Sequence, residues 1–368
     1  MIITVVFYIF VAVTVLQLCY YFSFLPFLFH KNKKNPESDI TPISVIVCAK
    51  NEAENLKKNI PLLLSQEYKT FQLVLINDAS NDDTLDIMKS FQKSDHRIKI
   101  VSVKNNEAFW GNKKYALTLG IKAATYEHLL FTDADCAPAS KNWIEEMSAQ
   151  FSEKKSIVLG YGKYQSKKYS FVNLLVRFET LLTAIQSFSY AKLGSPYMAV
   201  GRNLAYTKSD FFRVNGFINH IQVRSGDDDL FIKDAATSSN TTISVHPTSF
   251  TISEAPETMK EWFRQKRRHV STSSHYKAKH KFFLGLFYSS KLLFLVLIPV
   301  ILVFKLDYIT SSLLASYIIL NYLVIGFSGK KLNERNTVYF LPFLEVFLVL
   351  FQFAIFISNT VSKPTHWK

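Results

Sequence analysis

Long stretches without a charged residue constrain this chain more than any other feature of its sequence. No Asp, Glu, Lys or Arg occurs from Met1 to Phe29, and about 20 apolar residues are enough to cross a bilayer. A cleaved signal peptide would begin with a basic region and have a shorter apolar core, and this segment has neither. We therefore expect residues 1–30 to form a retained N-terminal transmembrane helix.

The last third of the chain repeats this pattern. Three further segments carry at most one charged residue each, namely Phe282–Phe304, Tyr308–Ser328 and Thr337–Ser362. Buried core helices of globular proteins are seldom this long. Residues 282–362 therefore predict a C-terminal transmembrane region of about three helices.

Basic residues border these apolar segments. They follow the first segment, precede the second and separate the third from the fourth: Lys31, Lys33, Lys34, Lys277, Lys279, Lys281, Lys330, Lys331 and Arg335. Because basic residues beside spans stay in the cytoplasm, we expect an integral membrane protein whose polar middle is cytoplasmic. The C-terminal tail lies outside if the last segment crosses the bilayer, and inside if that segment dips and returns. The net charge of +14 fits anionic lipid headgroups, so nucleic acid is not needed as a partner.

Between the apolar segments, strand patterns alternate with helix patterns. Buried strands are predicted at residues 42–48, 71–76, 98–103 and 128–132. Such alternation is typical of an α/β fold with a mostly parallel sheet, in which ligands bind at the carboxyl ends of the strands. Residues 169–193 form an apolar helix pattern, which fits either a core helix or an interfacial helix lying against the bilayer.

Polar side chains follow three of these strands. Asn51 and Glu52 come after the first strand, Asp78 after the second, and Asp133 and Asp135 after the fourth. In an extended segment Asp133 and Asp135 point to the same side, and a divalent cation would neutralise their repulsion. These residues predict a site for a metal ion and a diphosphate. Neither a Gly-x-Gly-x-x-Gly sequence after the first strand nor a Gly-Lys-Ser/Thr phosphate loop is present.

Four ordered motifs resemble those of the family 2 inverting glycosyltransferases, which have the GT-A fold. They are Pro42–Glu52, Asn77–Ser80, Gly111–Leu117 and Thr132–Asp135. The resemblance covers residues 41–281 and implies a cytoplasmic GT-A glycosyltransferase domain with a mostly parallel sheet, flanked by transmembrane helices.

The resemblance also implies roles for single residues. Asn51, Glu52 and Asp78 would hold the nucleoside of a nucleotide-sugar donor. A Lys of the third motif, Lys113, would approach that donor. Asp135 would carry Mg²⁺ or Mn²⁺, and Asp133 would lie beside the ribose or diphosphate as a second metal ligand.

Three consecutive carboxylates, Asp227 to Asp229, precede the apolar Leu230. Inverting sugar transfer needs a carboxylate that takes the proton from the attacking hydroxyl. The block resembles the family's Glu-Asp or Asp-Asp motif, in which an Asp is the base. Counting back from Leu230 favours Asp227, and matching a Gly-Asp-Asp form favours Asp228, so both are candidates. A helix N-cap with acidic first-turn residues is the competing explanation.

The segment Gln265–His269 resembles the family's Gln-x-x-Arg-Trp motif, with His269 where Trp is usual. Arg268 is suited to bind phosphate through two hydrogen bonds, and Gln265 to bind the same ligand or the acceptor. A basic patch on lipid is the alternative reading. The missing Trp argues against stacking on an acceptor sugar, and so against a long polysaccharide product.

Together these features predict a membrane-bound, metal-dependent hexosyltransferase of cell-envelope glycan biosynthesis. It would move a sugar from a UDP- or GDP-linked donor to a lipid or lipid-linked glycan, with inversion. A processive polysaccharide synthase with the same chemistry is the main alternative. A sugar-nucleotide pyrophosphorylase is disfavoured because Lys50–Glu52 is not a Gly-rich loop. A non-enzymatic transporter is disfavoured because four spans leave little room for a pore.

Overall fold

The computed structural model describes residues 1–32, 41–104, 113–223 and 225–362. It divides into two compact units. The α/β unit comprises Lys31–Ser166 and Gly194–Ala255, and the apolar-helix unit comprises Met1–His30, Lys167–Leu193 and Pro256–His366. Some residues used above lie outside the described part of the chain: Lys33, Lys34, Gly111, Asn112 and the last six residues of the tail.

A seven-stranded sheet forms the centre of the α/β unit, with the strand order β3-β2-β1-β4-β8-β6-β9. Its strands are β1 (Ile43–Ala49), β2 (Phe71–Asp78), β3 (Ile98–Val103), β4 (His128–Asp133), β6 (Ile157–Gly160), β8 (Leu204–Thr207) and β9 (Thr241–Ser244). Among these strands only β8 is antiparallel to its neighbours, β4 and β6. A second sheet of three short strands consists of β5 (Ala137–Pro138), β7 (Gly162–Tyr164) and β10 (Thr251–Ser253). The predicted α/β fold with a mostly parallel sheet is confirmed.

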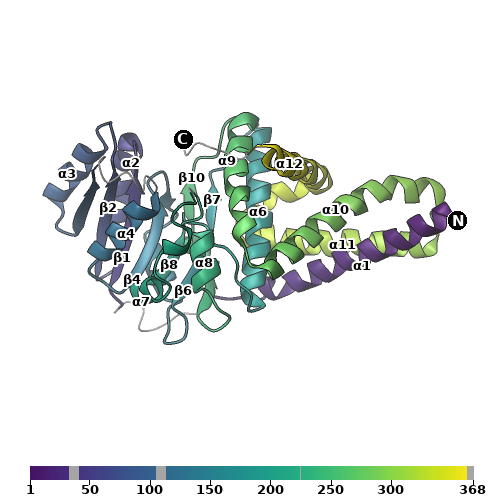
Figure 1. The fold of residues 1–368 in the computed structure, drawn as a ribbon, viewed down its shortest axis with the longest axis horizontal. Helices are drawn as coiled ribbons and strands as arrows, with labels where there is room; N and C mark the ends of the chain where they lie inside the picture. The colour runs from purple at the N-terminus through teal and green to yellow at the C-terminus, as the bar shows by residue number, and fades with distance from the viewer. Residues whose placement is uncertain (33–40, 105–112, 224, 363–368) are drawn as a thin grey trace. The chain divides into compact units, whose positions relative to one another are not determined.

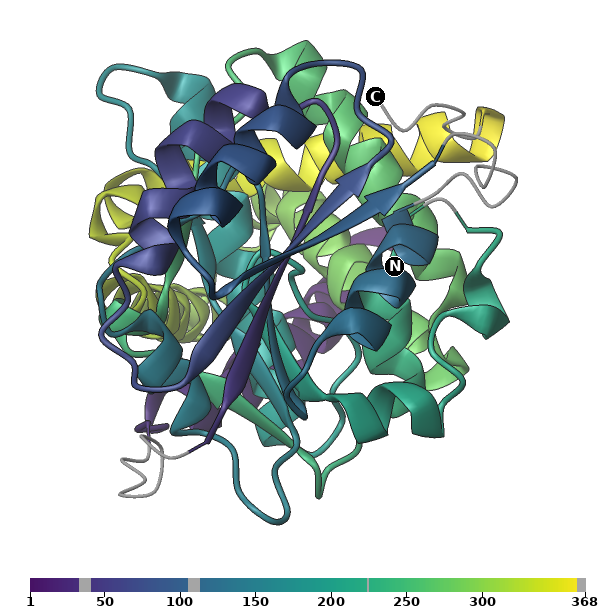
Figure 2. The same ribbon diagram turned by 90° about the vertical axis from the view of Figure 1, so that its left-hand side faces the viewer.

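Helices cover both faces of the large sheet, as Figure 2 shows for its β1 to β4 half. They are α2 (Ala53–Leu64), α3 (Thr84–Ser94), α4 (Lys113–Ala123), α5 (Trp143–Ser148), α7 (Lys208–Arg213) and α8 (Asp229–Ala235). Strand side chains alternate between the faces. Val45 and Val47 therefore share a buried cluster with residues of α2, α3 and α5, whereas Ile46 and Ile76 face Gly120 of α4. Burial on both faces explains the nearly continuous apolar runs of β1 and β2.

One buried amide joins several parts of the unit. Asn203 is fully buried, and its Nδ2 donates to the carbonyl oxygens of Tyr161 (3.0 Å) and Ser249 (2.7 Å). Its Oδ1 accepts from Trp143 Nε1 at 3.1 Å. A Cβ added at Gly160 would lie 2.5 Å from Asn203 Cγ, so the amide requires a glycine at that position.

We expect Gly160→Ala to lower the free energy of unfolding by about 1–3 kcal/mol, because the added methyl group overpacks this site. The measurement is the thermal unfolding midpoint of the full chain in detergent. Gly285→Ala is the matched control, because a Cβ there meets nothing within 4 Å. An unchanged midpoint for Gly160→Ala would show that the Asn203 site adapts without cost.

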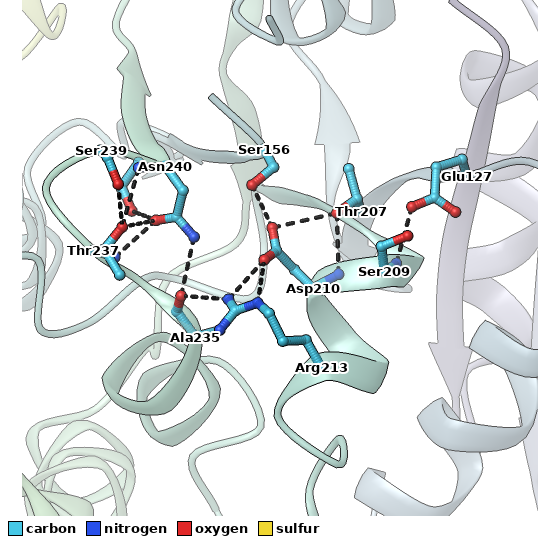
Figure 3. Close-up of polar contacts among 11 residues, drawn as sticks. Glu127, Ser156, Thr207, Ser209, Asp210, Arg213, Ala235, Thr237, Ser239 and Asn240 are labelled. Carbon is cyan, nitrogen blue, oxygen red and sulfur yellow. Dashed lines mark hydrogen bonds and ion pairs between the residues drawn. The ribbon is translucent and has the colours of Figure 1, made fainter. Parts of the chain in front are cut away.

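The amino-terminal edge of the parallel strands is closed by a polar network (Figure 3). The buried carboxylate of Asp210 accepts a hydrogen bond from Ser156 and pairs with Arg213 at 2.7 Å. Arg213 and Asn240 both donate to the carbonyl oxygen of Ala235, at 3.0 Å each. The polar groups of this edge hold the fold together, whereas Asp78, Asp133 and Asp135 lie at the carboxyl-terminal edge.

Long helices make up the apolar-helix unit. They are α1 (Ile2–Leu28), α6 (Phe171–Lys192), α9 (Met259–Ser271), α10 (Ala278–Phe304), α11 (Tyr308–Lys331) and α12 (Leu341–Val361). Four segments are long and apolar enough to cross a membrane: Ile2–Leu28, Ala278–Phe304, Tyr308–Lys331 and Arg335–Val361. The predicted long apolar helices are therefore present, and they suggest association with a membrane. α1 packs along both α10 and α11.

The two charged residues within the predicted apolar segments pair with each other. Lys291 Nζ of α10 lies 2.8 Å from Glu345 Oε1 of α12. The Glu345 carboxylate also accepts from Tyr21 (3.0 Å) and Asn321 (2.9 Å). Charges inside apolar bundles are tolerated when they are paired in this way.

Candidate functional site

The predicted site residues of the α/β unit lie at the ends of its central strands, which are labelled β1, β2 and β4 in Figure 1. β1 pairs in parallel with both β2 and β4, so the three strands end together. Five of the predicted residues end these strands or follow them directly: Asn51, Glu52, Asp78, Asp133 and Asp135.

Asn51 holds the loops after β1 and β2 together. It adopts a left-handed conformation with φ 57°. Its N–H donates to Ser80 Oγ at 3.0 Å, and its Oδ1 accepts from the Asn81 N–H at 2.9 Å. Glu52 stands at the N-cap of α2 and accepts from Asn55 Nδ2 at 2.6 Å. Both side chains thus shape the loop edge where we expect a nucleoside.

The carboxylates next to these loops differ in their roles. Asp82 accepts from the backbone N–H groups of Ala53 (3.3 Å) and Thr84 (3.1 Å), so it ties the starts of α2 and α3 together. Asp83 is the N-cap residue of α3, but its side chain makes no capping bond. Asp78 is half-buried, and desolvation raises its pKa against the opposing effect of nearby lysines.

Asp133 and Asp135 form the core of a candidate metal site. Ligand atoms of Asp133, Asp135 and Cys136 all lie within 4.8 Å of one another. Desolvation and then the Asp133 charge raise the pKa of Asp135, although its side chain reaches solvent. Burial raises the pKa of the Cys136 thiol far above its usual value, and its Sγ donates to Asp135 Oδ1 at 3.3 Å. The two repelling carboxylates fit a hard, oxygen-preferring cation such as Mg²⁺ or Mn²⁺.

Lys113 joins Asp133 of the candidate metal site to Asp227 of the second acidic cluster. Its Nζ lies 2.7 Å from Asp133 Oδ1 and 3.2 Å from Asp227 Oδ2. Desolvation disfavours the charged amine, but the two carboxylates outweigh it and raise the pKa of Lys113 well above its usual value. One ammonium group therefore connects the end of β4 with the segment before α8.

Asp227 and Asp228 have different surroundings. Asp228 Oδ2 accepts from the Gly201 N–H and its Oδ1 from the Asp229 N–H, both at 2.8 Å. Burial and then the Asp227 charge raise the pKa of Asp228 to about 6. Asp228 is the N-cap of α8, so the capping explanation holds for this member of the block. The carboxylate of Asp227 instead pairs with Lys113 Nζ at 3.2 Å.

A pocket in the α/β unit collects these groups. Its polar walls come from Lys113, Asp133, Asp227 and Asp228, and its apolar walls include Ile46, Leu117, Phe131 and Leu204. The pocket is therefore lined by carboxylates from two separate elements, β4 and the segment before α8.

Lys114 is a buried lysine next to Lys113 that the sequence analysis did not single out. Its side chain is 1% exposed, and its Nζ donates to the carbonyl oxygens of His220 and Val223 at 2.8 Å each. Desolvation lowers the pKa of Lys114 to about 8. The available signal was position, because Lys114 shares one helix face with the apolar residues Leu117 and Ile121.

Gln265 and Arg268 lie on α9, in the apolar-helix unit. They are therefore not among the predicted site residues that lie together in the α/β unit. In its own unit α9 begins with a capping box of Thr258 and Glu261, and its Trp262 ring stacks on Phe351 with centroids 4.0 Å apart.

Comparison with known proteins gives consistent results. Residues 44–209 match the model of glycosyl transferase family 2. The poly-β-1,6-N-acetyl-D-glucosamine synthase of Staphylococcus epidermidis is 30% identical over 171 residues, which are 42% of this chain and 40% of the relative. The 4,4'-diaponeurosporenoate glycosyltransferase of Staphylococcus haemolyticus is 25% identical over 198 residues, 52% of this chain and 51% of the relative. The matches thus span about half of these relatives or less.

A solved structure resembles the whole fold. It is a mannosyltransferase from Pyrobaculum calidifontis in complex with GDP-Man and Mn²⁺, with a TM-score of 0.58 and 15% sequence identity. The alignment covers 94% of this chain and 99% of that one. At this identity the likeness concerns the fold alone. The family match assigns residues 44–209 to glycosyltransferase family 2, and the shared fold shows that the α/β unit is GT-A-like.

Proposed function

We propose that this protein is a metal-dependent inverting glycosyltransferase that moves a sugar from a UDP- or GDP-linked donor to a lipid or lipid-linked glycan. One observation supports this most strongly. Lys113 contacts both Asp133, a candidate metal ligand, and Asp227, a candidate base. A diphosphate held near Asp133 and an acceptor near Asp227 would therefore be neighbours.

In the proposed reaction, Asp227 takes the proton from the acceptor hydroxyl. The acceptor oxygen forms a bond to the anomeric carbon from the side opposite the leaving group. The bond from that carbon to the diphosphate oxygen breaks, and the nucleoside diphosphate leaves. Asp133 and Asp135 would hold Mg²⁺ or Mn²⁺, which supplies positive charge to the diphosphate when bound. Lys113 adds a second positive charge on the same side.

Other residues complete the proposal. Asn51, Glu52 and Asp78 would bind the nucleoside at the carboxyl edge of β1 and β2. Gln265 and Arg268 of α9 would bind phosphate or the acceptor. The proposed catalytic region is residues 41–281, which include the α/β unit and also α6 and α9 of the apolar-helix unit. We propose that it faces the cytoplasm because of the basic residues that border the apolar helices.

A panel of UDP- and GDP-sugars incubated with the purified full chain tests the proposal. We expect one donor to release nucleoside diphosphate in the presence of Mn²⁺ or Mg²⁺ and to lose this activity with EDTA. Asp227→Asn is the matched inactive protein. The absence of turnover with every donor would contradict the enzyme assignment.

The acceptor is the less constrained part of the proposal. Four long apolar helices favour an acceptor confined to the membrane. The name of the Staphylococcus haemolyticus relative also fits a lipid acceptor, whereas that of the Staphylococcus epidermidis synthase favours a polymer. Membranes incubated with radiolabelled donor distinguish the two. We expect label in an organic-extractable product of one added sugar, and label in a water-soluble polymer would favour a polysaccharide synthase.

Lys114→Met should lower kcat by about tenfold or more with little change in the donor KM. The substitution removes two charge-assisted hydrogen bonds, each worth about 1.5–3 kcal/mol, to the segment that leads to Asp227. Steady-state kinetics on the purified enzyme provide the measurement. Lys114→Arg should recover part of the rate, because it keeps the positive charge and the donors.

Lys122→Met is the control for this prediction, because Lys122 is exposed on the same helix. A purely structural role of Lys114 would lower thermal stability and leave the kcat of the folded fraction unchanged. That result would remove Lys114 from the set of positioning residues.

A further inference from the structure

We propose that α12 does not cross the membrane. Its length and composition make Arg335–Val361 a candidate span. We infer instead that α12 lies along the membrane surface, with one apolar face on the lipid acyl chains and with its C-terminal end on the same side as α9.

Three of the long helices define two ends of a bundle. α1 ends, α10 begins and α11 ends at what we call the polar end. There, Lys331 Nζ donates to the carbonyl oxygen of Leu28 at 2.8 Å, and Tyr20 Oη donates to that of Phe283 at 2.7 Å. At the opposite end, Lys305 Nζ lies 5.8 Å from the centre of the Phe7 ring. Helices α1, α10 and α11 thus run the full distance between the two ends.

The chain enters α12 at the polar end. A 3-10 helix, Arg335–Phe340, links α11 to α12. The Glu334 N–H before it donates to the Gly329 carbonyl oxygen in the last turns of α11, at 2.6 Å. The Glu334 carboxylate pairs with Arg177 of α6, and both side chains are buried. The start of α12 is therefore fixed next to the end of α11.

The other end of α12 returns to α9. Arg267 donates to Asn359 Oδ1 (3.0 Å), to the Ser358 carbonyl oxygen (3.2 Å) and to Ser362 Oγ (2.9 Å). Asn359 Nδ2 donates back to the Arg267 carbonyl oxygen at 3.0 Å. Halfway along α12, Phe351 stacks on Trp262 of the same α9.

α9 is too polar to lie in hydrocarbon. Its 13 residues include Lys260, Glu261, Arg264, Lys266, Arg267 and Arg268, and charges at the bilayer centre are strongly disfavoured. If α12 crossed the bilayer, its last turn would lie on the far side of about 30 Å of hydrocarbon, away from a charged helix such as α9. Because α9 holds both the middle and the last turn of α12, these parts of α12 stay at the level of α9.

The direction and the surface of α12 agree with this placement. Figure 1 shows α12 foreshortened while α10 and α11 run lengthwise, and in Figure 2 α12 lies lengthwise across the view. From Phe343 to Ile357, the exposed large side chains of α12 are apolar, each 43–65% exposed: Phe343, Val346, Leu350, Phe353, Phe356 and Ile357. This exposed side can face lipid acyl chains while Phe351 packs on α9.

Cysteine accessibility in intact cells tests the inference, and it does not depend on any enzyme activity. Three variants of the full chain carry one added cysteine each: Leu306→Cys between α10 and α11, Lys279→Cys at the polar end, and Ser362→Cys. A membrane-impermeant maleimide is applied before or after permeabilisation, and labelled peptides are identified by mass spectrometry. This readout separates the added cysteines from Cys19, Cys48 and Cys136.

We expect positions 279 and 362 to react under the same condition and position 306 under the opposite one. Reaction of position 362 together with position 306 would overturn the inference. An epitope appended after Lys368 repeats the test without altering any native residue. We expect the antibody to reach the epitope under the same condition as the maleimide reaches position 279. If it reaches the epitope under the condition in which position 306 reacts, α12 crosses the membrane.

Discussion

Replacing Asp227 by asparagine should lower kcat by about 10²-fold or more, with the donor KM changed only a few-fold. The amide has nearly the same shape but cannot take the acceptor proton. Asp227 is the member of the block whose carboxylate meets Lys113 in the pocket. We therefore expect the loss to appear in turnover, measured with the donor found by the panel.

Two further variants make this prediction specific. Asp83→Asn removes a carboxylate whose side chain makes no capping bond, so it should keep near-normal turnover. Asp228→Asn should lower stability as well as turnover, because its two oxygens accept the Gly201 and Asp229 N–H groups. If Asp227→Asn keeps near-normal kcat while Asp228→Asn loses it in a stably folded protein, the base is Asp228.

The sequence predicted the framework of the site because strand patterns and polar strand ends are local properties. The apolar runs predict buried parallel strands, and the carboxyl ends of parallel strands lie at one edge of the sheet. Asp78, Asp133 and Asp135 are found at that edge. The apolar helices were predictable for the same reason, since about 20 uncharged residues form a strong local signal.

Contacts between distant segments could not be predicted in this way. Asp228 is anchored by Gly201, 27 residues away, and no local pattern distinguishes it from Asp227. Consecutive residues of a helix point about 100° apart. Lys113 therefore faces the carboxylates while Lys114 faces the carbonyl oxygens of another segment, but the sequence presents both as equivalent lysines.

Hydropathy also cannot fix the path of a helix. α12 is as apolar as the helices beside it, and only its contacts with α9 show where its last turn lies. Hydropathy reports what a segment can be buried in, whereas its direction depends on partners far away in the sequence.

Asp135→Ala should reduce metal-dependent turnover by about 10²–10³-fold, because a bound cation contributes several kcal/mol to charge stabilisation and each ~1.4 kcal/mol is a factor of ten. The side chain reaches solvent at the strand edge, so the substitution should leave the thermal unfolding midpoint almost unchanged. Removing this carboxylate also removes a charge that repels Asp133. In the variant, Lys113 should therefore stay paired with Asp133. The variant protein should fold normally.

Metal binding provides a readout besides activity. Calorimetric titration of the purified chain with Mn²⁺ and nucleoside diphosphate should show weaker binding for Asp135→Ala than for the unmodified chain. Asp83→Asn, a carboxylate loss elsewhere on the same unit, should bind as the unmodified chain does. If Asp135→Ala keeps both Mn²⁺ affinity and metal-dependent turnover, Asp135 is not a ligand. The repulsion between Asp133 and Asp135 would then be relieved by Lys113 alone, and the metal would have to bind through other oxygen atoms.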